Sequence, residues 1–138
     1  MKTIDNYLLE QATTKPKIFY HGSPTKGIKV LEPRLDPRLN MKGVFLTHYI
    51  ESAILFSLLS KRHKASMETV TKNGRVTKLI VRSKIPLNPT GYLYSIKDNP
   101  KIVERAPFRY VSKIDVKPFK EEVVRIQDIE HVLDFKRV

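Results

Sequence analysis

The sequence predicts a single α+β domain that spans residues 1–138. Apolar residues over positions 49–60 recur at helical spacing, whereas from Arg75 onwards they recur with the period of two that is typical of strands. A chain of 138 residues can bury one core without disulfides, and this chain has no cysteine. It shows no internal repeat, linker or low-complexity segment, so no second domain is expected.

The first half of the chain alternates expected helices and strands. In chain order we expect a helix over residues 1–14, a strand over Lys17–Tyr20, a long ordered loop over 24–42, a strand over Gly43–Thr47 and a helix over about 49–60. Pro16 ends the first helix because proline cannot continue a helical hydrogen-bond ladder. The last helix should bury Ile50, Ala53, Ile54 and Leu58.

The second half is expected to be rich in strands. Residues 61–73 are predicted to be a polar, basic connection that closes at Asn73-Gly74, a dipeptide typical of hairpin turns. The expected strands that follow are one from Arg75 to Ile85 ended by Pro86, then Gly91–Ile96, Phe108–Ser112, Ile114–Val116 and Val123–Ile126, with Val132–Phe135 as a further strand or a turn.

The charge of the chain favours a polyanionic partner. The net charge is +12 and the isoelectric point is about 10.0, which predicts attraction to nucleic acid, acidic protein or anionic lipid. More than half of the excess lies between residues 61 and 84, where Glu68 is the one acidic residue. The residues expected to bind nucleic acid there are Lys61, Arg62, Lys64, Lys72 and Arg75. The alternative is a solvated basic surface that keeps the protein soluble.

Several classes of protein are disfavoured by the composition. No apolar run approaches the roughly 20 residues that a membrane helix needs, and the first residues lack the apolar core of a signal peptide. The absence of cysteine fits a reducing compartment, so a cytoplasmic protein with no membrane association is expected. The glycines form no phosphate-binding loop, and the histidines show no spacing that predicts a metal site.

Two short apolar runs carry the most specific signal. The first is Phe19-Tyr20-His21-Gly22-Ser23-Pro24, a strand that stops at a polar turn. The second is Gly43-Val44-Phe45-Leu46-Thr47, which a helical segment follows at once. Two strands that both break beside small or polar residues can form a cleft in which the backbone approaches a ligand.

In this order and spacing, these segments resemble the ADP-ribosyltransferase fold. The likeness is to its diphtheria-toxin and poly(ADP-ribose) polymerase branch, which includes many small bacterial and phage proteins. With Gly91-Tyr92-Leu93-Tyr94 and Tyr110-Val111-Ser112, it touches most of residues 18–118. The resemblance implies split mixed β-sheets, with an N-terminal helix and a helix after the second strand. It also implies NAD as cofactor and transfer of ADP-ribose to a macromolecular acceptor.

The resemblance assigns roles to particular residues. In that family a His-Tyr-Glu constellation binds NAD. Here His21 would hydrogen-bond a ribose hydroxyl, and Gly22 would offer backbone groups to the nicotinamide carboxamide, its missing Cβ allowing close approach. Phe45 would form an aromatic wall, and Phe56 stands nearest to the helix tyrosine that stacks on nicotinamide. The other cofactor-binding candidates are Ser23 in the polar turn, and Arg34 and Arg38 in the proline-rich loop.

The position of the family's catalytic glutamate is occupied by Arg109. A cation is electrostatically unfavourable beside the positive charge that develops as nicotinamide leaves. The protein therefore either performs no ADP-ribosyl transfer or takes its carboxylate from Glu104, or less favourably from Glu121 or Glu122. The RNA 2′-phosphotransferases of the same fold use basic residues instead, although their arginine and histidine pattern is not evident here.

Three functional hypotheses follow. The first is an NAD-dependent ADP-ribosyltransferase-like enzyme with His21, Arg109 and Glu104 as catalytic residues and nucleic acid as one candidate acceptor. The second is a catalytically degenerate member of the fold that binds a nucleotide, nucleic acid or acidic protein. The third is a basic α+β interaction module whose resemblance to the family is accidental.

Overall fold

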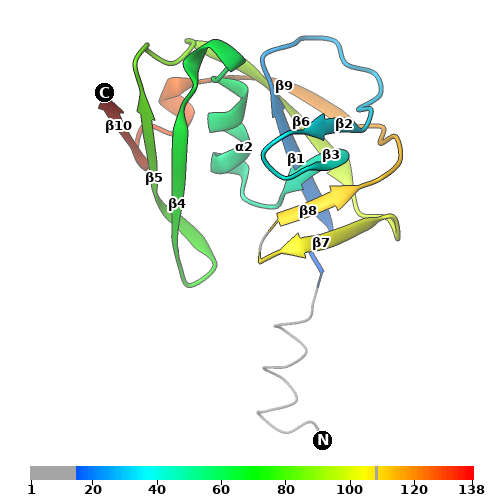
Figure 1. Cartoon of the computed structure of the whole chain (residues 1–138). Coiled ribbons are helices and arrows are strands. Elements are labelled where there is room, and N and C mark those ends of the chain that lie inside the picture. The colour runs from blue at the N-terminus through cyan, green and yellow to red at the C-terminus, as the bar shows by residue number, and fades with distance from the viewer. Residues whose placement is uncertain (1–14, 108) are drawn as a thin grey trace, which may run out of the picture.

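The alternation of apolar and polar residues produces a mostly β structure in the computed structural model, which describes residues 15–107 and 109–138 (Figure 1). The elements, in chain order, are β1 (Ile18–Ser23), β2 (Arg34–Asp36), β3 (Met41–Thr47), α2 (Ile50–Ser57), the 3-10 helix η1 (Lys61–His63), β4 (Ser66–Lys72), β5 (Arg75–Ser83), β6 (Thr90–Lys97), β7 (Ile102–Ala106), β8 (Arg109–Ser112), β9 (Lys120–Arg125), the 3-10 helix η2 (Ile126–Asp128) and β10 (Leu133–Arg137). The helix expected over residues 1–14 lies outside the described residues.

The strands form two sheets. The larger has seven strands in the order β7-β8-β3-β1-β6-β9, with β2 paired to β3, and every pairing in it is antiparallel. The smaller has the order β10-β5-β4, in which β10 is parallel to β5. The described residues thus form one small α+β domain with mixed pairing, as the sequence predicts at that level.

The core lies on both faces of the large sheet because its strands alternate apolar residues between the two faces. On β6, Leu93 packs into one cluster with α2 and the small sheet, whereas the neighbouring Tyr94 and Ile96 pack into a second cluster on the opposite face. Figure 1 shows α2 between the two sheets. The second cluster includes Leu31 and Val116, which exchange two backbone hydrogen bonds at 2.8 and 2.9 Å.

Helix α2 lies in direct backbone contact with the large sheet. A Cβ at Gly22 would stand 1.8 Å from the carbonyl oxygen of Ala53, and a Cβ at Gly91 would stand 2.4 Å from that of Ser57. Gly22 pairs with Leu93, so both glycines lie on the sheet face that α2 covers. Glycine at these two positions therefore sets how closely the helix approaches β1 and β6.

The loop between β1 and β2 is anchored by Tyr94 and Glu121. The buried Tyr94 hydroxyl lies 2.7 Å from both the Thr25 carbonyl oxygen and Glu121 Oε1, and it accepts a hydrogen bond from the Ile28 N–H at 3.2 Å. Glu121 Oε1 also accepts from the Gly27 N–H at 2.5 Å. The hydrogen bonds from the Gly27 N–H and the Tyr94 hydroxyl lower the pKa of the Glu121 carboxyl, which therefore stays ionised as an acceptor.

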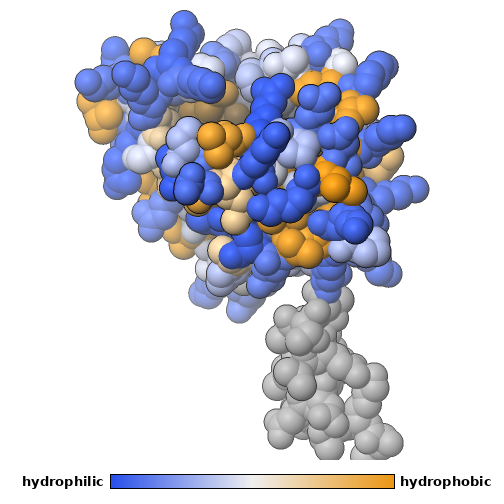
Figure 2. All heavy atoms as spheres, turned by 45° about the vertical axis from the view of Figure 1, so that its right-hand side comes forward, coloured by the Kyte–Doolittle hydropathy of each residue, from blue (hydrophilic) through white to orange (hydrophobic). Residues whose placement is uncertain are grey.

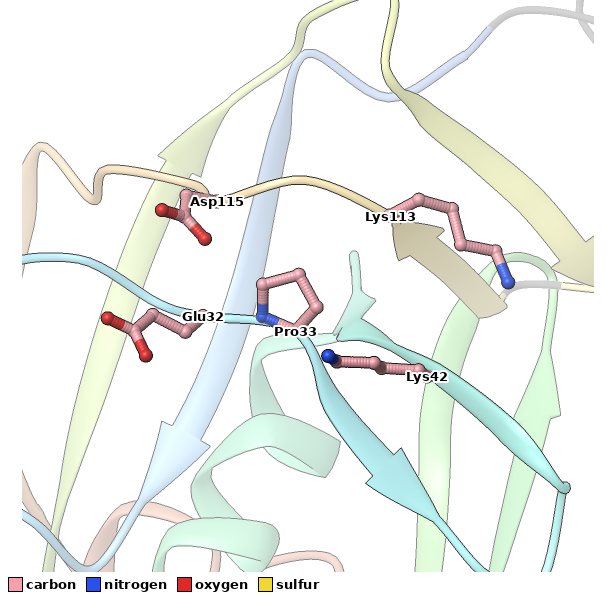
Figure 3. A pocket seen from close by; sticks show the side chains of 5 residues that line it. All are labelled: Glu32, Pro33, Lys42, Lys113 and Asp115. Carbon is pink, nitrogen blue, oxygen red and sulfur yellow. The ribbon is translucent and has the colours of Figure 1, made fainter.

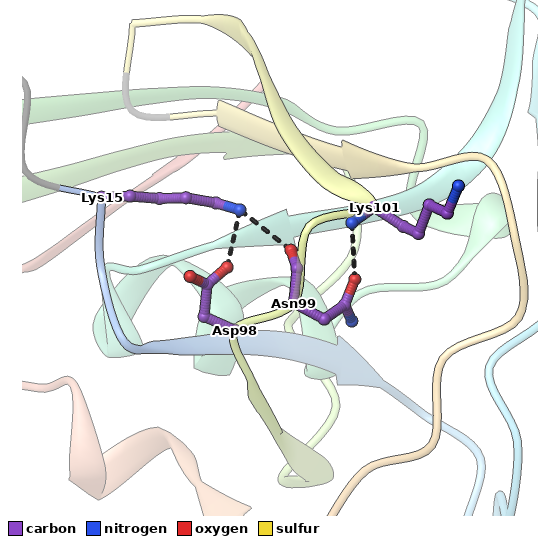
Figure 4. Close-up of polar contacts among 4 residues, drawn as sticks. All are labelled: Lys15, Asp98, Asn99 and Lys101. Carbon is purple, nitrogen blue, oxygen red and sulfur yellow. Dashed lines mark hydrogen bonds and ion pairs between the residues drawn. The ribbon is translucent and has the colours of Figure 1, made fainter.

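The turn from β6 to β7 ties down the start of the described chain (Figure 4). Lys15 Nζ forms an ion pair with Asp98 at 2.7 Å and donates to the Asn99 carbonyl oxygen at 2.9 Å. The Asn99 side chain accepts from the Lys101 N–H at 2.8 Å, the local bond that makes asparagine common in turns.

The face of the molecule in Figure 2 is mainly hydrophilic, and apolar side chains appear on it in small separate groups. Exposed apolar residues come from several parts of the described chain, among them Leu35, Val103, Ile114 and Val123. Within residues 15–107 and 109–138, no helix has the length and apolar character needed to cross a membrane.

Most expected elements are present, three expectations require correction, and one strand was not expected. Asn73 and Gly74 both have positive φ, +54° and +74°, as the predicted hairpin turn requires. Ile50 was expected in the core and is 38 % exposed, because it begins α2 at its outer end. Residues 61–73 contain η1 and β4 rather than a connection, and Ile114–Val116 forms a single bridge rather than a strand. β7, which the sequence analysis left unassigned, is an edge strand.

We expect Gly22→Ala to lower the free energy of unfolding by at least about 3 kcal/mol, since the new methyl group would meet helix backbone that cannot move alone. Gly27→Ala is the matched control: its Cβ would meet no atom within 4 Å, so its cost is limited to the positive φ, about 1 kcal/mol. Urea unfolding of both variants measures the difference. Equal costs would contradict the role of Gly22 in seating α2.

Candidate functional site

The candidate site lies where β1 and β3 separate. β1 pairs with β6 along its whole length but meets β3 at one position, Tyr20 opposite Thr47. Towards Gly22 the two strands diverge, and the first part of β3 pairs with β2 instead. His21 near the end of β1 and Phe45 within β3 lie at this opening, where a hydrogen bond joins them.

His21 bridges the opening by a hydrogen bond. Its Nδ1 lies 2.9 Å from the carbonyl oxygen of Phe45. A carbonyl oxygen can only accept, so Nδ1 carries the proton, and in the neutral ring Nε2 is an acceptor. The imidazole therefore takes the place of a backbone donor between β1 and β3 and leaves one ring nitrogen able to accept a hydrogen bond from a ligand.

The surroundings of His21 favour its neutral form. Desolvation by burial lowers the pKa of His21 below its ordinary value of 6.5, and the positive charge of Arg34 lowers it further, against the opposing effect of the Phe45 carbonyl. Arg34 thus lies close enough to His21 to act on its charge. A ring held neutral keeps Nε2 available as an acceptor.

Phe45 is covered on one side by an arginine that the sequence analysis did not single out. The guanidinium carbon of Arg105, on β7, lies 5.5 Å from the centroid of the Phe45 ring, a cation–π distance. The Arg105 Nε is buried and has no hydrogen-bond partner in the described structure. Phe45 is partly buried, and its ring lies on the opposite face of the large sheet from His21, whose hydrogen bond is to the Phe45 backbone.

Arg34 and Arg38 have different surroundings. Arg34 pairs with Gly43, two residues before Phe45, and so lies on the face of β3 that carries the Phe45 ring. Arg38 lies in the β2–β3 turn, where its backbone N–H donates to Asp36 Oδ1 at 2.9 Å and its guanidinium lies 3.5 Å from Asp36 Oδ2. Of the two, Arg34 is near His21, and Arg38 is occupied by Asp36.

The other expected cofactor residues have local explanations. The Cβ side of Gly22 faces the backbone of α2, so the missing Cβ serves helix packing rather than the approach of a ligand. The Ser23 hydroxyl accepts from the Thr25 N–H at 3.1 Å and stabilises the turn after β1. Phe56 projects from α2 with 46 % of its surface exposed, so its ring face is open.

None of the three candidate carboxylates lies beside His21. Glu104 lies on β7 opposite Tyr110 of β8, and Tyr110 lies opposite Leu46 of β3. Because β1 follows β3 in the sheet, Glu104 stands three strands, or about 14 Å, from β1. Burial is the main cause of the shifted pKa values of Tyr110 and His48, and the charge of Glu104 is the second cause in both. Glu121 anchors the β1–β2 loop through Tyr94, and Glu122 forms an ion pair with Lys120 at 3.3 Å.

Arg109 is exposed and lies opposite Thr47, which in turn lies opposite Tyr20 of β1. It therefore stands two strands from β1 on the face that carries Phe45. Its charge acts on the neighbouring Arg105: desolvation lowers the pKa of Arg105 and the repulsion by Arg109 lowers it further. The position expected for glutamate is thus part of a cationic group.

The five basic residues expected to bind nucleic acid form two groups rather than one patch. All are exposed. Those from η1 and just after it (Lys61, Arg62, Lys64) lie at one end of β4, and those of the hairpin tip (Lys72, Arg75) lie at the other. A seven-residue strand separates the groups by about 23 Å. On the sheet between them, Lys78 pairs with Asp134 at 3.4 Å, which reduces the local excess of charge.

A hollow of about 500 Å³ lies apart from these residues (Figure 3). It is lined by Glu32, Pro33, Lys42, Lys113 and Asp115, so two carboxylates and two ammonium groups balance there. In the described part of the chain, no three or more His, Asp or Glu side chains are grouped closely enough to hold a metal ion.

Comparison of the chain with protein-family models, curated proteins and solved structures finds no match.

We expect the lowered pKa of His21 to make the free energy of unfolding depend on pH. Because its folded-state pKa lies below 6.5, the unfolded chain binds more protons between the two values, so the free energy of unfolding rises with pH in this window and levels off above 6.5. His21→Gln should reduce this slope, while His48, whose pKa is also lowered, contributes equally to both proteins. Urea unfolding across this window tests it, and identical slopes would contradict the assignment.

Proposed function

We propose that the chain binds NAD at the opening between β1 and β3 as a member of the ADP-ribosyltransferase fold that has lost glutamate-dependent transfer. The observation that carries this proposal is the His21–Phe45 bridge, which fixes a neutral ring acceptor on one face of the β1–β3 opening, while the Phe45 ring lies on the other face of the same opening. Nucleotides need both groups, because ribose hydroxyls donate hydrogen bonds and bases stack on ring faces.

The residues have distinct roles in this proposal. His21 Nε2 accepts a hydrogen bond from a ribose hydroxyl, since Nδ1 is already engaged by the Phe45 carbonyl. The Phe45 ring packs against the flat face of the ligand. Arg34, which approaches His21 closely enough to affect its pKa, adds positive charge for the anionic part of NAD.

Binding is favoured over transfer by the placement of the charges. In ADP-ribosyl transfer, the bond from C1′ of the ribose to the nicotinamide nitrogen breaks, its electron pair leaves with nicotinamide, and an acceptor that loses a proton forms the new bond to C1′. The positive charge on the ribose is stabilised by a nearby anion. Here Arg105 lies over the Phe45 ring, Arg109 adds a second positive charge close to Arg105, and Glu104 stands about 14 Å from β1.

We expect calorimetry to detect NAD binding to the wild-type protein and at least about fivefold weaker binding to His21→Ala, since one hydrogen bond of this kind is worth on the order of 1 kcal/mol and the variant also frees the Phe45 carbonyl. His131→Ala, at an exposed histidine remote from β1 in the sequence, is the matched control and should bind like wild type. No heat with wild type, or an unchanged affinity in His21→Ala, would refute the proposal.

We expect no transfer of labelled ADP-ribose from NAD to single-stranded or double-stranded nucleic acid, or to the protein itself. The physical reason is the missing anion beside the ribose. Mass spectrometry of the acceptors after incubation with NAD measures the outcome. Transfer that disappears in Glu104→Gln would establish the enzymatic alternative instead.

A further inference from the structure

Strand β7 contains a β-bulge that positions one arginine at the candidate site. Glu104 opposes Tyr110 and Ala106 opposes Arg109, so Arg105 is the extra residue that has no partner on β8. A bulge of this kind turns a side chain out of the regular alternation of the strand, and bulges are frequent beside functional sites. Here it directs the Arg105 guanidinium across the sheet to the Phe45 ring.

The guanidinium of Arg105 is not satisfied by the described residues. Its Nε is buried without a hydrogen-bond partner, although buried polar groups are nearly always paired. The Phe45 ring contacts the flat face of the Arg105 guanidinium by cation–π attraction. The N–H donors lie at the edges of this planar group, so that contact leaves them unused.

The charges around Arg105 favour an anion. Arg105 and Arg109 repel each other, and Asp36, the carboxylate near Arg105, is already bonded to Arg38. This arrangement is destabilising when no anion is present and becomes favourable when an anion binds.

We propose that Arg105, with Arg109, forms an oxyanion subsite beside Phe45 that takes a phosphate or pyrophosphate group. Arginine suits this chemistry because its planar donors match two phosphate oxygens at once. The inference deepens the proposed function, since it assigns the phosphate groups of a bound nucleotide to Arg105 and Arg109, while Arg38 remains bound to Asp36. It does not require NAD, because inorganic pyrophosphate can occupy the same subsite.

The test measures the affinity for inorganic pyrophosphate by calorimetry at constant ionic strength. Arg105→Gln should weaken binding at least about tenfold, because it removes a charge-assisted pair of hydrogen bonds. Arg105→Lys keeps the charge but not the planar donors and should fall in between. The matched control is Arg82→Gln, which makes the same change of charge at an exposed position on the small sheet and should bind like wild type.

A second readout uses the folded wild-type protein, so a failure of the variants to fold leaves the proposal testable. The Nε–H signal of Arg105 in ¹⁵N–¹H NMR spectra, assigned by its loss in Arg105→Lys, should shift on addition of pyrophosphate. An unshifted signal, or equal weakening in Arg105→Gln and Arg82→Gln, would overturn the subsite. NAD binding that is unaffected by Arg105→Gln would overturn the inference and leave the proposed function intact. Pyrophosphate binding without NAD binding would support the subsite and refute the proposed function.

Discussion

Helix α2 lies directly on the end of β1 because Gly22 presents no Cβ to the Ala53 carbonyl oxygen. This contact fixes the strand from the side of the small sheet, since α2 packs between the two sheets. His21, the preceding residue, faces the opposite side of β1, where it pairs with Tyr94 in the second core cluster. The strand end is therefore held from both faces, and the imidazole is placed by packing before any ligand is considered.

The divergence of β1 from β3 is the second constraint. Backbone groups at a strand end need partners, and here one of them, the Phe45 carbonyl, is bonded by a side chain instead of by a neighbouring strand. The same hydrogen bond fixes the proton on Nδ1 and leaves Nε2 as the acceptor of the imidazole. Tyr94 and Glu121 hold the adjoining loop by bonds to Thr25 and Gly27, so the edge of the opening is fixed as well.

The sequence predicts the local parts of this structure better than the long-range ones. The hairpin at Asn73-Gly74 follows from turn chemistry, and the burial of Ala53 and Leu58 from helical spacing. Arg105 at the site was beyond prediction, because its position depends on a bulge that arises from the pairing of β7 with β8. The separation of Lys61 from Lys72 could not be predicted either. The two residues are close in sequence, but β4 lies between them, and its residues were expected to form a polar connection. Glu104 is near Arg109 in sequence, but the strand order sets its distance from β1.

In the proposed complex, a nucleotide spans the β1–β3 opening with its ribose at His21, its flat ring at Phe45 and its phosphates at the β7 bulge. The most direct measurement is a map of NMR chemical-shift changes over the whole chain during a titration with NAD. We predict the largest changes at the backbone amides around His21 and Phe45 and at Arg105, which lie on three different strands. Changes confined to the basic hairpin around Lys72 and Arg75, or to the hollow at Lys42 and Lys113, would contradict the proposed complex.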